Sequence, residues 1–303
     1  MYGVIDIGSN TIRMVIYKTE NGEIKAVLNK KTVAGLVGYV NKKNNLSEKG
    51  INRVVEVLSE YKDVTDSIMI DGVYVFATAI FRNIGNKDDV LAIIKEKCGF
   101  DVKILSGYEE ANFGYEGTVK TIKLENGILA DIGGGSTELV FYKDGQAVHS
   151  CSMPIGSLNL YTGYVGKILP KRAELEEMKK AVKKEIKKLE LPKIGFVPTT
   201  LCAVGGTART AHKLVEKFSE DSVYGSYQCK KLKEIIKSSQ TYAKGFITAL
   251  IKIAPERIHT IIPGMVIMYT IAKYFELENV VTSTYGVREG FLYNILKEKI
   301  IYE

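Results

Sequence analysis

Several residue patterns that would narrow the function are scarce in this sequence. The four cysteines are scattered without metal-ligand spacing, which predicts reduced thiols in a cytoplasmic protein. The three histidines are isolated, which argues against histidine-based nucleophilic or metal catalysis and against a Ser-His-Asp site. No Gly-Lys-Ser or Gly-Lys-Thr sequence occurs, so a Walker-type phosphate loop is excluded.

Long apolar runs are missing too. None reaches the ~20 residues that a membrane span needs, and no charged segment or cleavage site precedes the first predicted strand. We therefore expect no signal peptide and no membrane partner, and nucleic acid is not an expected partner either. A chain of 303 residues with 46% apolar residues is long enough for two domains with real cores.

Arginine is rare, although the net charge is +7 because lysine is abundant. The excess of positive charge favours an anionic partner only weakly, since lysine-rich surfaces are common. Four of the seven arginines lie in or beside segments rich in Gly and Thr. Because the guanidinium fork suits phosphate and carboxylate, these four are candidates for positioning an anion. They are Arg13, Arg82, Arg209 and Arg288.

One pattern occurs twice. Residues 4–18 and residues 129–143 each contain an apolar strand, an aspartate, a tight turn with glycine, and a second apolar strand. The aspartates are Asp6 and Asp131, and the turns contain Gly8-Ser9-Asn10 and Gly133-Gly134-Gly135. The two copies predict two similar halves, each of which begins with a hairpin.

The pattern between and after the two copies predicts an α/β fold with two domains, each a mixed sheet flanked by helices. Ser47 is a plausible N-cap for a helix with Ile51, Val54, Leu58 and Tyr61 on one face. Residues 78–86 are expected to form a polar turn, and Pro170 to begin a long helix with a lysine face. Because glutamates alternate with these lysines, a solvated face is favoured over a surface that tracks a long polyanion. The predicted strands are 2–7, 12–18, 24–33, 73–77, 102–105, 128–132, 137–142, 146–153, 200–204 and 280–282. The other predicted helices are 88–98, 109–121, 205–215, 231–253, 264–275 and 290–300.

The repeated pattern suits phosphate chemistry. A carboxylate at a strand end is a hard oxygen ligand for Mg²⁺, which takes further ligands from water and phosphate. Successive backbone N–H groups in a glycine turn can hold phosphate oxygens. A single Asp-x-Gly turn is more simply explained by local turn geometry. Two copies in corresponding places favour a cleft between two such walls, with a metal-bound polyphosphate in it.

Other segments leave alternatives open. Glu109 and Glu110 lie at a strand-to-helix junction, where either could interact with the helix dipole or orient a water in the cleft. Glu138 could face solvent or point into the cleft. Arg82 would project from a loop at a strand end. Gly205-Gly206-Thr207 opens a helix, whose N-terminus could accept an anion.

Together these residues resemble the exopolyphosphatase / guanosine pentaphosphate phosphohydrolase family, in its short two-domain form. That family belongs to the sugar kinase–actin–heat-shock chaperone superfamily. The resemblance runs in order over nearly the whole chain. It covers residues 6–11, 77–86, 106–111, 131–139, 205–207, 262–264 and 286–290.

The resemblance implies two ribonuclease-H-like (actin-like ATPase) domains, 1–123 and 124–303, with an interdomain cleft. The last helix, about 290–303, is assigned to the second domain, and its packing against the first domain is left open. The implied cofactor is Mg²⁺, held by Asp131 with Asp6. Glu110 is implied as the catalytic base, which selects it over Glu109, with Glu138 and Arg82 as further catalytic residues. The implied phosphate-binding residues are Gly8, Ser9, Asn10, Gly133, Gly134, Gly135, Ser136, Gly205, Gly206 and Thr207.

The sequence therefore predicts a Mg²⁺-dependent exopolyphosphatase that releases terminal orthophosphate from inorganic polyphosphate. The nearest alternative is a guanosine pentaphosphate or tetraphosphate phosphohydrolase that uses the same residues. A non-catalytic sensor of polyphosphate or alarmone is an alternative of another class, and a sugar or acetate kinase is less favoured. The family resemblance also implies a homodimer.

Overall fold

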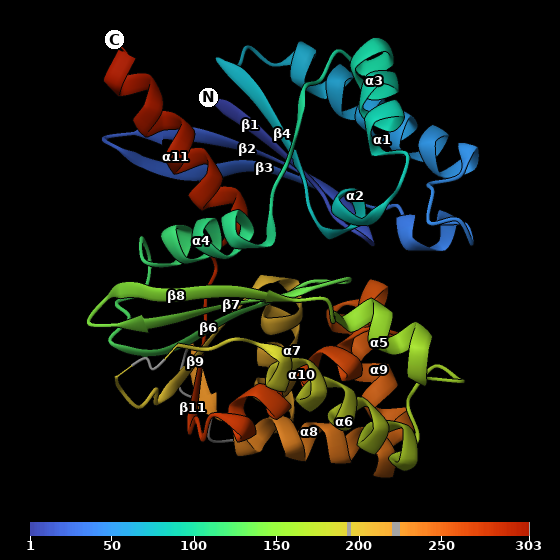
Figure 1. Cartoon of the computed structure of the whole chain (residues 1–303), viewed down its shortest axis with the longest axis vertical. Coiled ribbons are helices and arrows are strands. Elements are labelled where there is room, and N and C mark those ends of the chain that lie inside the picture. Colours follow the sequence, from blue (N-terminus) through green and yellow to red (C-terminus); the bar gives the residue numbers. More distant parts are fainter. Residues whose placement is uncertain (193–194, 220–224, 303) are drawn as a thin grey trace. The chain divides into compact units, whose positions relative to one another are not determined.

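The computed structural model describes residues 1–192, 195–219 and 225–302 (Figure 1). The chain divides into two compact units, Met1–Glu109 and Glu110–Glu303. Each unit contains one mixed sheet with helices packed against it. The α/β prediction is confirmed, whereas the domain boundary between 123 and 124 stays a prediction.

The sheet of the first unit has the order β3-β2-β1-β4-β5. Strands β1, β2 and β3 are antiparallel neighbours, and β4 and β5 extend the sheet in parallel with β1. The repeated Asp6 therefore lies near the end of a central strand, where the chain turns into β2. The strands are β1 (Tyr2–Ile7), β2 (Thr11–Glu20), β3 (Glu23–Val33), β4 (Gly72–Ala77) and β5 (Val102–Ile104).

The helices of the first unit follow the predicted capping and apolar patterns. Helix α1 (Glu48–Ser67) begins after Ser47, whose hydroxyl accepts a hydrogen bond from the Gly50 N–H at 3.4 Å. Val54, Leu58 and Tyr61 on its apolar face are fully buried. Helix α3 (Lys87–Cys98) ends at Gly99, which adopts the left-handed conformation that suits glycine at a helix end.

The turn predicted for residues 78–86 is wrong, because the chain forms the short helix α2 (Ala79–Asn83) there. The N–H groups of Phe81 and Arg82 both donate to the Thr78 carbonyl. Ala79, Ile80 and Phe81 are buried in the core of the unit. Burial of these apolar side chains outweighs the polar character of the segment, so Arg82 lies on a helix and not on a loop.

The sheet of the second unit has the order β10-β11-β9-β6-β7-β8. Strands β6, β7 and β8 repeat the antiparallel arrangement of β1, β2 and β3, and β9 runs parallel to β6. The short strand β10 was not predicted. The strands are β6 (Asn126–Ile132), β7 (Thr137–Lys143), β8 (Gln146–Met153), β9 (Thr200–Val204), β10 (Ser226–Gln228) and β11 (Asn279–Thr282).

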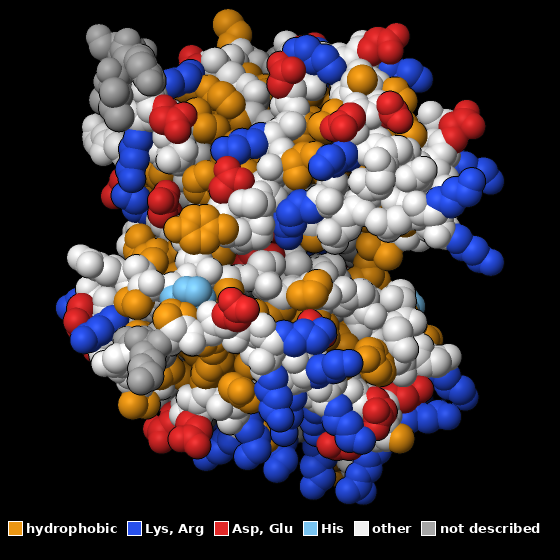
Figure 2. All heavy atoms as spheres, in the orientation of Figure 1, with side chains coloured by type: hydrophobic (Ala, Val, Ile, Leu, Met, Phe, Trp, Pro, Cys, Tyr) orange, Lys and Arg blue, Asp and Glu red, His pale blue; other side chains and the backbone are white. Residues whose placement is uncertain are grey.

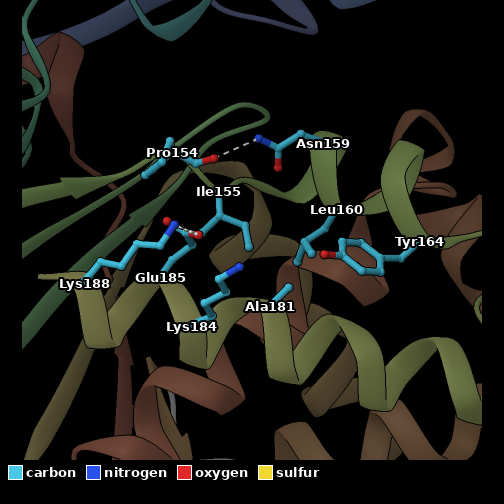
Figure 3. Close-up of a pocket in the computed structure, with 9 residues that line it drawn as sticks. All are labelled: Pro154, Ile155, Asn159, Leu160, Tyr164, Ala181, Lys184, Glu185 and Lys188. Atoms are coloured by element: carbon cyan, nitrogen blue, oxygen red, sulfur yellow. Dashed lines mark hydrogen bonds and ion pairs between the residues drawn. The ribbon is translucent and has the colours of Figure 1, made fainter.

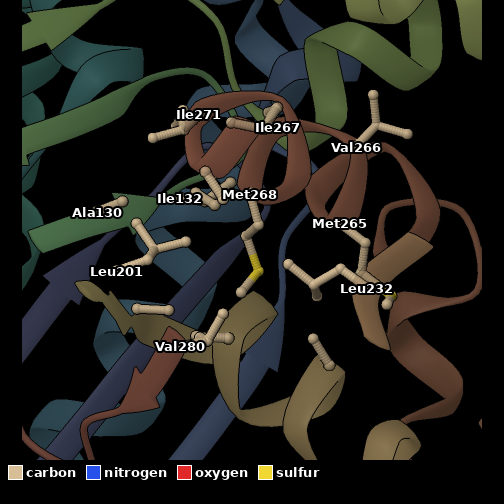
Figure 4. Packing of buried hydrophobic residues seen from close by; sticks show 14 of the residues in the cluster. Ala130, Ile132, Leu201, Leu232, Met265, Val266, Ile267, Met268, Ile271 and Val280 are labelled. Atoms are coloured by element: carbon tan, nitrogen blue, oxygen red, sulfur yellow. The ribbon is translucent and has the colours of Figure 1, made fainter. Parts of the chain in front are cut away.

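One face of this sheet packs against the largest apolar core of the chain. Helix α10 (Ile261–Tyr274) is buried on almost all sides, and Figure 4 shows Met268 of this helix near Ile132 of β6 and Met265 beside Leu232. A helix that is apolar all round belongs inside a core. The other helices on this side include α7 (Gly205–Phe218), α8 (Lys230–Thr241), α9 (Ala243–Ile253) and the short η2 (Pro255–Arg257).

The helix predicted to begin at Pro170 is α6 (Arg172–Lys188), and a further helix, α5 (Ser157–Tyr164), precedes it where none was predicted. Helix α6 buries the predicted apolar stripe of Leu175, Met178, Val182 and Ile186. Its exposed lysines belong to the basic side chains that gather at the lower end of the face in Figure 2. Helix α5 is short and only weakly amphipathic, so its apolar period gives little signal.

The opposite face of the sheet is covered by α4 (Gly107–Thr118), of which residues from Glu110 onward belong to the second unit (Figure 1). Helix α4 crosses α11 (Val287–Tyr302) at two glycines. A Cβ at Gly117 would overlap the Gly286 carbonyl, and one at Gly290 would overlap the Phe113 carbonyl. The rings of Phe113 and Phe291 meet edge to face, with centroids 5.5 Å apart. Among the described helices, none combines the length and apolarity needed to cross a bilayer.

Candidate active site

Two carboxylates face each other across the second hairpin. Asp131 on β6 pairs directly with Glu138 on the antiparallel strand β7. Directly opposed residues lie on the same face, with Cβ atoms about 5 Å apart. Glu138 is fully buried, with Oε1 accepting a hydrogen bond from the Ser152 hydroxyl at 2.9 Å. Like charges so placed destabilise a sheet, and a bound cation would relieve that repulsion.

The same face of the sheet carries the packing surface of α4. Leu129, Val140 and Val204 form a buried cluster there with Ala111 and Tyr115 of α4. Since side chains alternate along a strand, Asp131 shares its face with Leu129, and Glu138 shares its face with Val140.

Glu110 immediately precedes the contact made by Ala111 and is only 8% exposed. Two residues later in α4, the Asn112 Oδ1 accepts a hydrogen bond from the Ser150 hydroxyl at 2.7 Å. Ser150 and Ser152 are alternate residues on one face of β8, and Ser152 pairs with Glu138. The structure thus places Glu110, Asp131 and Glu138 on one side of one sheet.

Glu109 has a different role from its neighbour. Its carboxylate accepts hydrogen bonds from the N–H and hydroxyl of Ser106 at 2.9 and 3.0 Å, while the Glu109 N–H donates back to that hydroxyl at 3.1 Å. Lys103 lies 3.0 Å away. Burial raises the pKa of Glu109, but these hydrogen bonds outweigh it and hold the pKa below its ordinary value. Glu109 is therefore committed to a capping box at the start of α4.

The glycine loop after β6 turns its carbonyls toward α5. The Gly133 N–H closes the turn on the Ser136 carbonyl at 3.0 Å, so that N–H is not available to a ligand. The carbonyls of Gly133, Gly134 and Gly135 accept hydrogen bonds from residues Ser157 to Asn159. In a trans peptide the N–H points opposite to the preceding carbonyl. The Gly134 and Gly135 N–H groups therefore point away from α5, and neither has an acceptor among the described residues.

Close contact between two glycines fixes this loop. A Cβ at Gly156 would lie 2.5 Å from the carbonyl group of Gly134, so no larger residue fits there. The side-chain amide of Asn159 donates to the Gly135 carbonyl at 2.9 Å and its Oδ1 accepts from the Gly156 N–H at 2.7 Å. These contacts fix the loop so that the Gly134 and Gly135 N–H groups can donate hydrogen bonds to a bound anion.

The start of α7 borders Asp131. Gly205 has φ +84°, and a Cβ there would lie 2.6 Å from Asp131 Oδ1. Thr207 donates its hydroxyl to the Ile132 carbonyl at 3.3 Å, so the hydroxyl already has a protein acceptor. Gly206 touches the guanidinium of Arg257, which a Cβ would overlap.

Arg257 is a residue that sequence reasoning missed. Burial lowers the pKa of its guanidinium, while the charges of Glu256 and Asp131 act in the opposite direction. The Arg257 guanidinium interacts electrostatically with Asp131 and packs against Gly206, in the turn between β9 and α7. It is therefore well placed to contact an anion bound near Asp131. The one signal that could have identified Arg257 is the rarity of arginine in this chain.

The first hairpin repeats the turn but not the pair of carboxylates. Asp6 pairs across β1 and β2 with Arg13. The Gly8 N–H closes its turn on the Thr11 carbonyl at 3.0 Å. The carbonyls of Ser9 and Asn10 accept hydrogen bonds from backbone N–H groups of residues 34–37. The N–H groups of Ser9 and Asn10 have no acceptor within the part of the chain that the structure describes.

Arg82 and Arg209 each bind backbone carbonyls near strand ends. Arg82 Nη1 donates to the Leu105 carbonyl at 2.8 Å, and Arg209 Nη1 to the Thr284 carbonyl at 3.3 Å. The predicted site residues thus fall into two sets. Asp6, Gly8, Ser9, Asn10 and Arg82 belong to the first unit. Glu110, Asp131, Gly133, Gly134, Gly135, Ser136, Glu138, Gly205, Gly206 and Thr207 belong to the second.

The donor set near Asp131 fits a divalent cation that is shared with a phosphate. Within residues 1–192, 195–219 and 225–302, no three His, Cys, Asp or Glu side chains are grouped to hold a metal by themselves. Mg²⁺ commonly uses one or two carboxylates and takes its other ligands from water and substrate phosphates. Asp131 with Glu138 and the neighbouring N–H groups meets that requirement.

Comparisons with known proteins agree with this chemistry. The model of the Ppx/GppA phosphatase family matches residues 15–299. A Haemophilus influenzae protein named "Putative exopolyphosphatase" is 25% identical, covering 97% of this chain and 90% of its own length. The Aliivibrio fischeri guanosine-5'-triphosphate,3'-diphosphate pyrophosphatase is 23% identical, with 98% of this chain matching 60% of that protein.

The fold agrees as well. The solved structure of the Aquifex aeolicus PPX-GPPA enzyme superposes with a TM-score of 0.77 at 26% identity, over 97% of this chain and 98% of that one. The described units have the two mixed α/β sheets expected of the actin-like fold. A phosphatase of this kind is expected to need a divalent metal in general. The chain belongs to the Ppx/GppA phosphatase family.

Proposed function

We propose that this protein is an exopolyphosphatase, which hydrolyses the terminal phosphoric anhydride bond of inorganic polyphosphate with Mg²⁺ as cofactor. The observation that carries the proposal is the pairing of Asp131 with Glu138 on the face of the sheet covered by α4. A glycine loop with outward N–H donors lies directly between these two residues in sequence. A polyanion with a divalent cation fits that combination of two carboxylates and several donors.

The residues of this chain have distinct roles in the proposed reaction. Asp131, supported by Glu138 and Asp6, would hold Mg²⁺, which neutralises charge on the phosphate oxygens. The Gly134 and Gly135 N–H groups bind oxygens of the terminal phosphoryl group, and Arg257 adds positive charge beside the turn at Gly206. Gly205, Ser136 and Thr207 shape and support this pocket of donors. Arg82, Ser9 and Asn10 keep the phosphate-binding roles predicted from the sequence, whereas Gly8 shapes the turn, because its N–H already donates to the Thr11 carbonyl.

Glu110 is the proposed general base. It takes one proton from water as the water oxygen attacks the terminal phosphorus. The bond from that phosphorus to the bridging oxygen breaks, and the shortened polyphosphate leaves as an anion. Positioning and charge neutralisation supply most of the rate acceleration, as is general for phosphoryl transfer.

The decisive experiment measures phosphate release from polyphosphate with Mg²⁺ for Glu110→Gln and Asp131→Asn. A general base contributes about 10²–10⁴-fold to the rate, so we expect a loss of that order for Glu110→Gln. For Asp131→Asn we expect a loss of roughly 10²–10³-fold, because a strong charge-stabilising group is removed. Glu109→Gln is the matched control, since Glu109 is a capping residue one position away and should keep near wild-type turnover. The proposal is wrong if both Glu110→Gln and Asp131→Asn release phosphate at the wild-type rate.

Guanosine pentaphosphate is the second candidate substrate, because the Aliivibrio fischeri relative is named for a guanosine-5'-triphosphate,3'-diphosphate. The chain spans about 60% of that relative's length, so its activity does not transfer directly. Phosphate release from graded polyphosphates, with guanosine pentaphosphate assayed beside them and as competitor, separates the two substrates. Tight binding of either compound without phosphate release would instead support a sensor.

The metal and the oligomer have their own tests. Chelation should abolish phosphate release and Mg²⁺ should restore it, whereas an activity indifferent to chelation would exclude the metal role of Asp131. We also infer a homodimer from the family resemblance, and light scattering on the purified chain measures its mass directly.

A further inference from the structure

A second polar pocket lies between α5 and α6, apart from the carboxylates described above. Its volume is about 320 Å³, at the small end of the range for ligand sites. Figure 3 shows that its wall combines the end of β8, one side of α5 and one side of α6. The lining residues are Pro154, Ile155, Asn159, Leu160, Tyr164, Ala181, Lys184, Glu185 and Lys188.

Lys184 gives this pocket an uncompensated positive charge. Lys188 is paired with Glu185 at 2.7 Å, and Lys179 and Lys180 have glutamate partners as well. By contrast, Lys184 has no carboxylate partner in the part of the chain that is described. In Figure 3 its amino group points toward the space between Ile155 and Leu160. The pocket therefore carries one net charge that an anion can neutralise.

The remaining walls are apolar and include one aromatic ring. Ile155 and Leu160 are buried, and Ala181 lies on α6 beside them. Tyr164 is 40% exposed and its hydroxyl points toward Leu160 in Figure 3. That hydroxyl has no hydrogen-bond partner among the described residues. A flat apolar body would fit against these side chains, with its polar edge toward the Tyr164 hydroxyl.

The segment that lines the pocket also holds the glycine loop. Ile155 accepts a hydrogen bond at its carbonyl from the Thr137 hydroxyl at 2.6 Å. Asn159 lines the pocket, and its side-chain amide donates to the Gly135 carbonyl. Gly156 touches Gly134 directly. A ligand that shifts residues 154–159 must therefore shift the loop that carries the Gly134 and Gly135 N–H donors.

We propose that this pocket binds a small organic anion that carries a planar ring, of the class of a nucleoside monophosphate, and that its occupancy regulates the glycine loop. The anionic group binds Lys184, and the ring packs on Leu160 and Tyr164. The regulatory half of the proposal rests on the proposed hydrolysis, because the glycine loop is its phosphate site. The binding half does not depend on any activity.

Calorimetric titration with AMP tests the binding half. Adenosine loses the charge-assisted contact with Lys184, and inorganic phosphate loses the burial of the ring. Each should therefore bind at least about tenfold more weakly than AMP. Lys184→Ala should weaken AMP binding by a similar factor, whereas Lys183→Ala, on the same helix but outside the pocket, should not. Equal affinities in the two variants, or no AMP binding at millimolar concentration, would overturn the site.

Hydrogen exchange of residues 133–136 tests the coupling without an assay of turnover. AMP should change exchange there in the wild type and leave it unchanged in Lys184→Ala. Phosphate release from polyphosphate should then shift at least about twofold in KM with AMP, and Lys184→Ala should lose the shift while keeping basal turnover. Unchanged exchange at saturating AMP would overturn the coupling. If the protein binds AMP but releases no phosphate from polyphosphate, the proposed hydrolysis is refuted and the proposed binding site is not.

Discussion

The hairpins β1–β2 and β6–β7 share one sequence pattern and differ in the residue opposite the aspartate. Asp6 pairs with Arg13, so the first hairpin places opposite charges across its strands. Asp131 pairs with Glu138, so the second hairpin places two negative charges there. The first arrangement places opposite charges together, whereas the second places two negative charges together, a combination that a bound divalent cation would stabilise. A repeated motif therefore need not imply two equal metal ligands.

The supports of the two turns differ as well. Gly8 and Gly133 close the same turn, each with a 3.0 Å hydrogen bond to the carbonyl three residues later. The first turn rests on backbone N–H groups of residues 34–37, and the second on residues 157–159 of α5. Only the second support involves a tight contact between glycines, at Gly156. Four predictions would break or sharpen this comparison.

The largest effect is expected for the aspartates themselves. Asp131→Asn should lower kcat for phosphate release by roughly 10²–10³-fold, the loss typical when one strong charge-stabilising group is removed. Asp6→Asn should cost clearly less, because Arg13 already lies opposite Asp6. Steady-state kinetics at saturating Mg²⁺ compare the two variants, and equal losses would show that the hairpins are equivalent.

The residues opposite the aspartates should differ in their effect on the metal. Glu138→Gln should raise the Mg²⁺ concentration for half-maximal activity by about 10–100-fold, the range for a residue that supports a metal ligand. Arg13→Gln removes the charge at the corresponding place in the first hairpin and should leave that concentration within about twofold. Titration of phosphate release with Mg²⁺ measures this concentration for both variants. A larger shift for Arg13→Gln would reverse our assignment of the metal wall.

Glycine substitutions probe the two supports. Gly156→Ala should lower the free energy of unfolding by about 1–3 kcal/mol, since overpacking against Gly134 forces backbone to move, and should impair phosphate release. Gly38→Ala, at the residue directly after the support of the first turn, has nothing within 4 Å of its added Cβ and should be close to neutral. Urea unfolding followed by circular dichroism measures both. Similar stabilities for the two variants would remove the distinction between the supports.

The smallest effect concerns the capping box before Glu110. The folded-state pKa of Glu109 is depressed, so its stabilisation is present above the unfolded-state pKa of about 4.3 and is lost as the pH falls through the folded value. Because Glu109 is half-exposed, Glu109→Gln should cost only about 0.5 kcal/mol at pH 7 and nothing near pH 3. Unfolding at the two pH values checks this, and a cost that persists at pH 3 would contradict it.

Sequence reasoning predicted local features well. Alternation placed all of the strands around Asp6 and Asp131, and Ser47 predicted the start of α1, because capping and periodicity act within a few residues. Helix α5 was not predicted from the sequence, because it is stabilised by hydrogen bonds to the glycine loop and not by an apolar period of its own. Helix α2 was predicted as a turn, because the polar residues of the segment gave no sign that Phe81 is buried in the folded unit.

The candidate site shows the same limit. Asp131, Glu138 and Glu110 were predicted as site residues, but their common face depends on strand register and on the packing of Ala111 and Tyr115 against the sheet. Arg257 lies 126 residues beyond Asp131 in the chain, and the two residues border the adjacent glycines Gly206 and Gly205 in the folded unit. No local pattern encodes such a contact.

The glycine crossing of α4 and α11 has a practical consequence for work with this protein. Gly117 and Gly290 bring the two backbones together so closely that neither helix can slide or rotate past the other without losing the contact. Helix α11 is thus held tightly against α4, the helix that carries Glu110. A truncation before residue 287 would leave α4 without this neighbour, so tags for purification or immobilisation belong at a surface loop or beyond residue 303, never in place of α11.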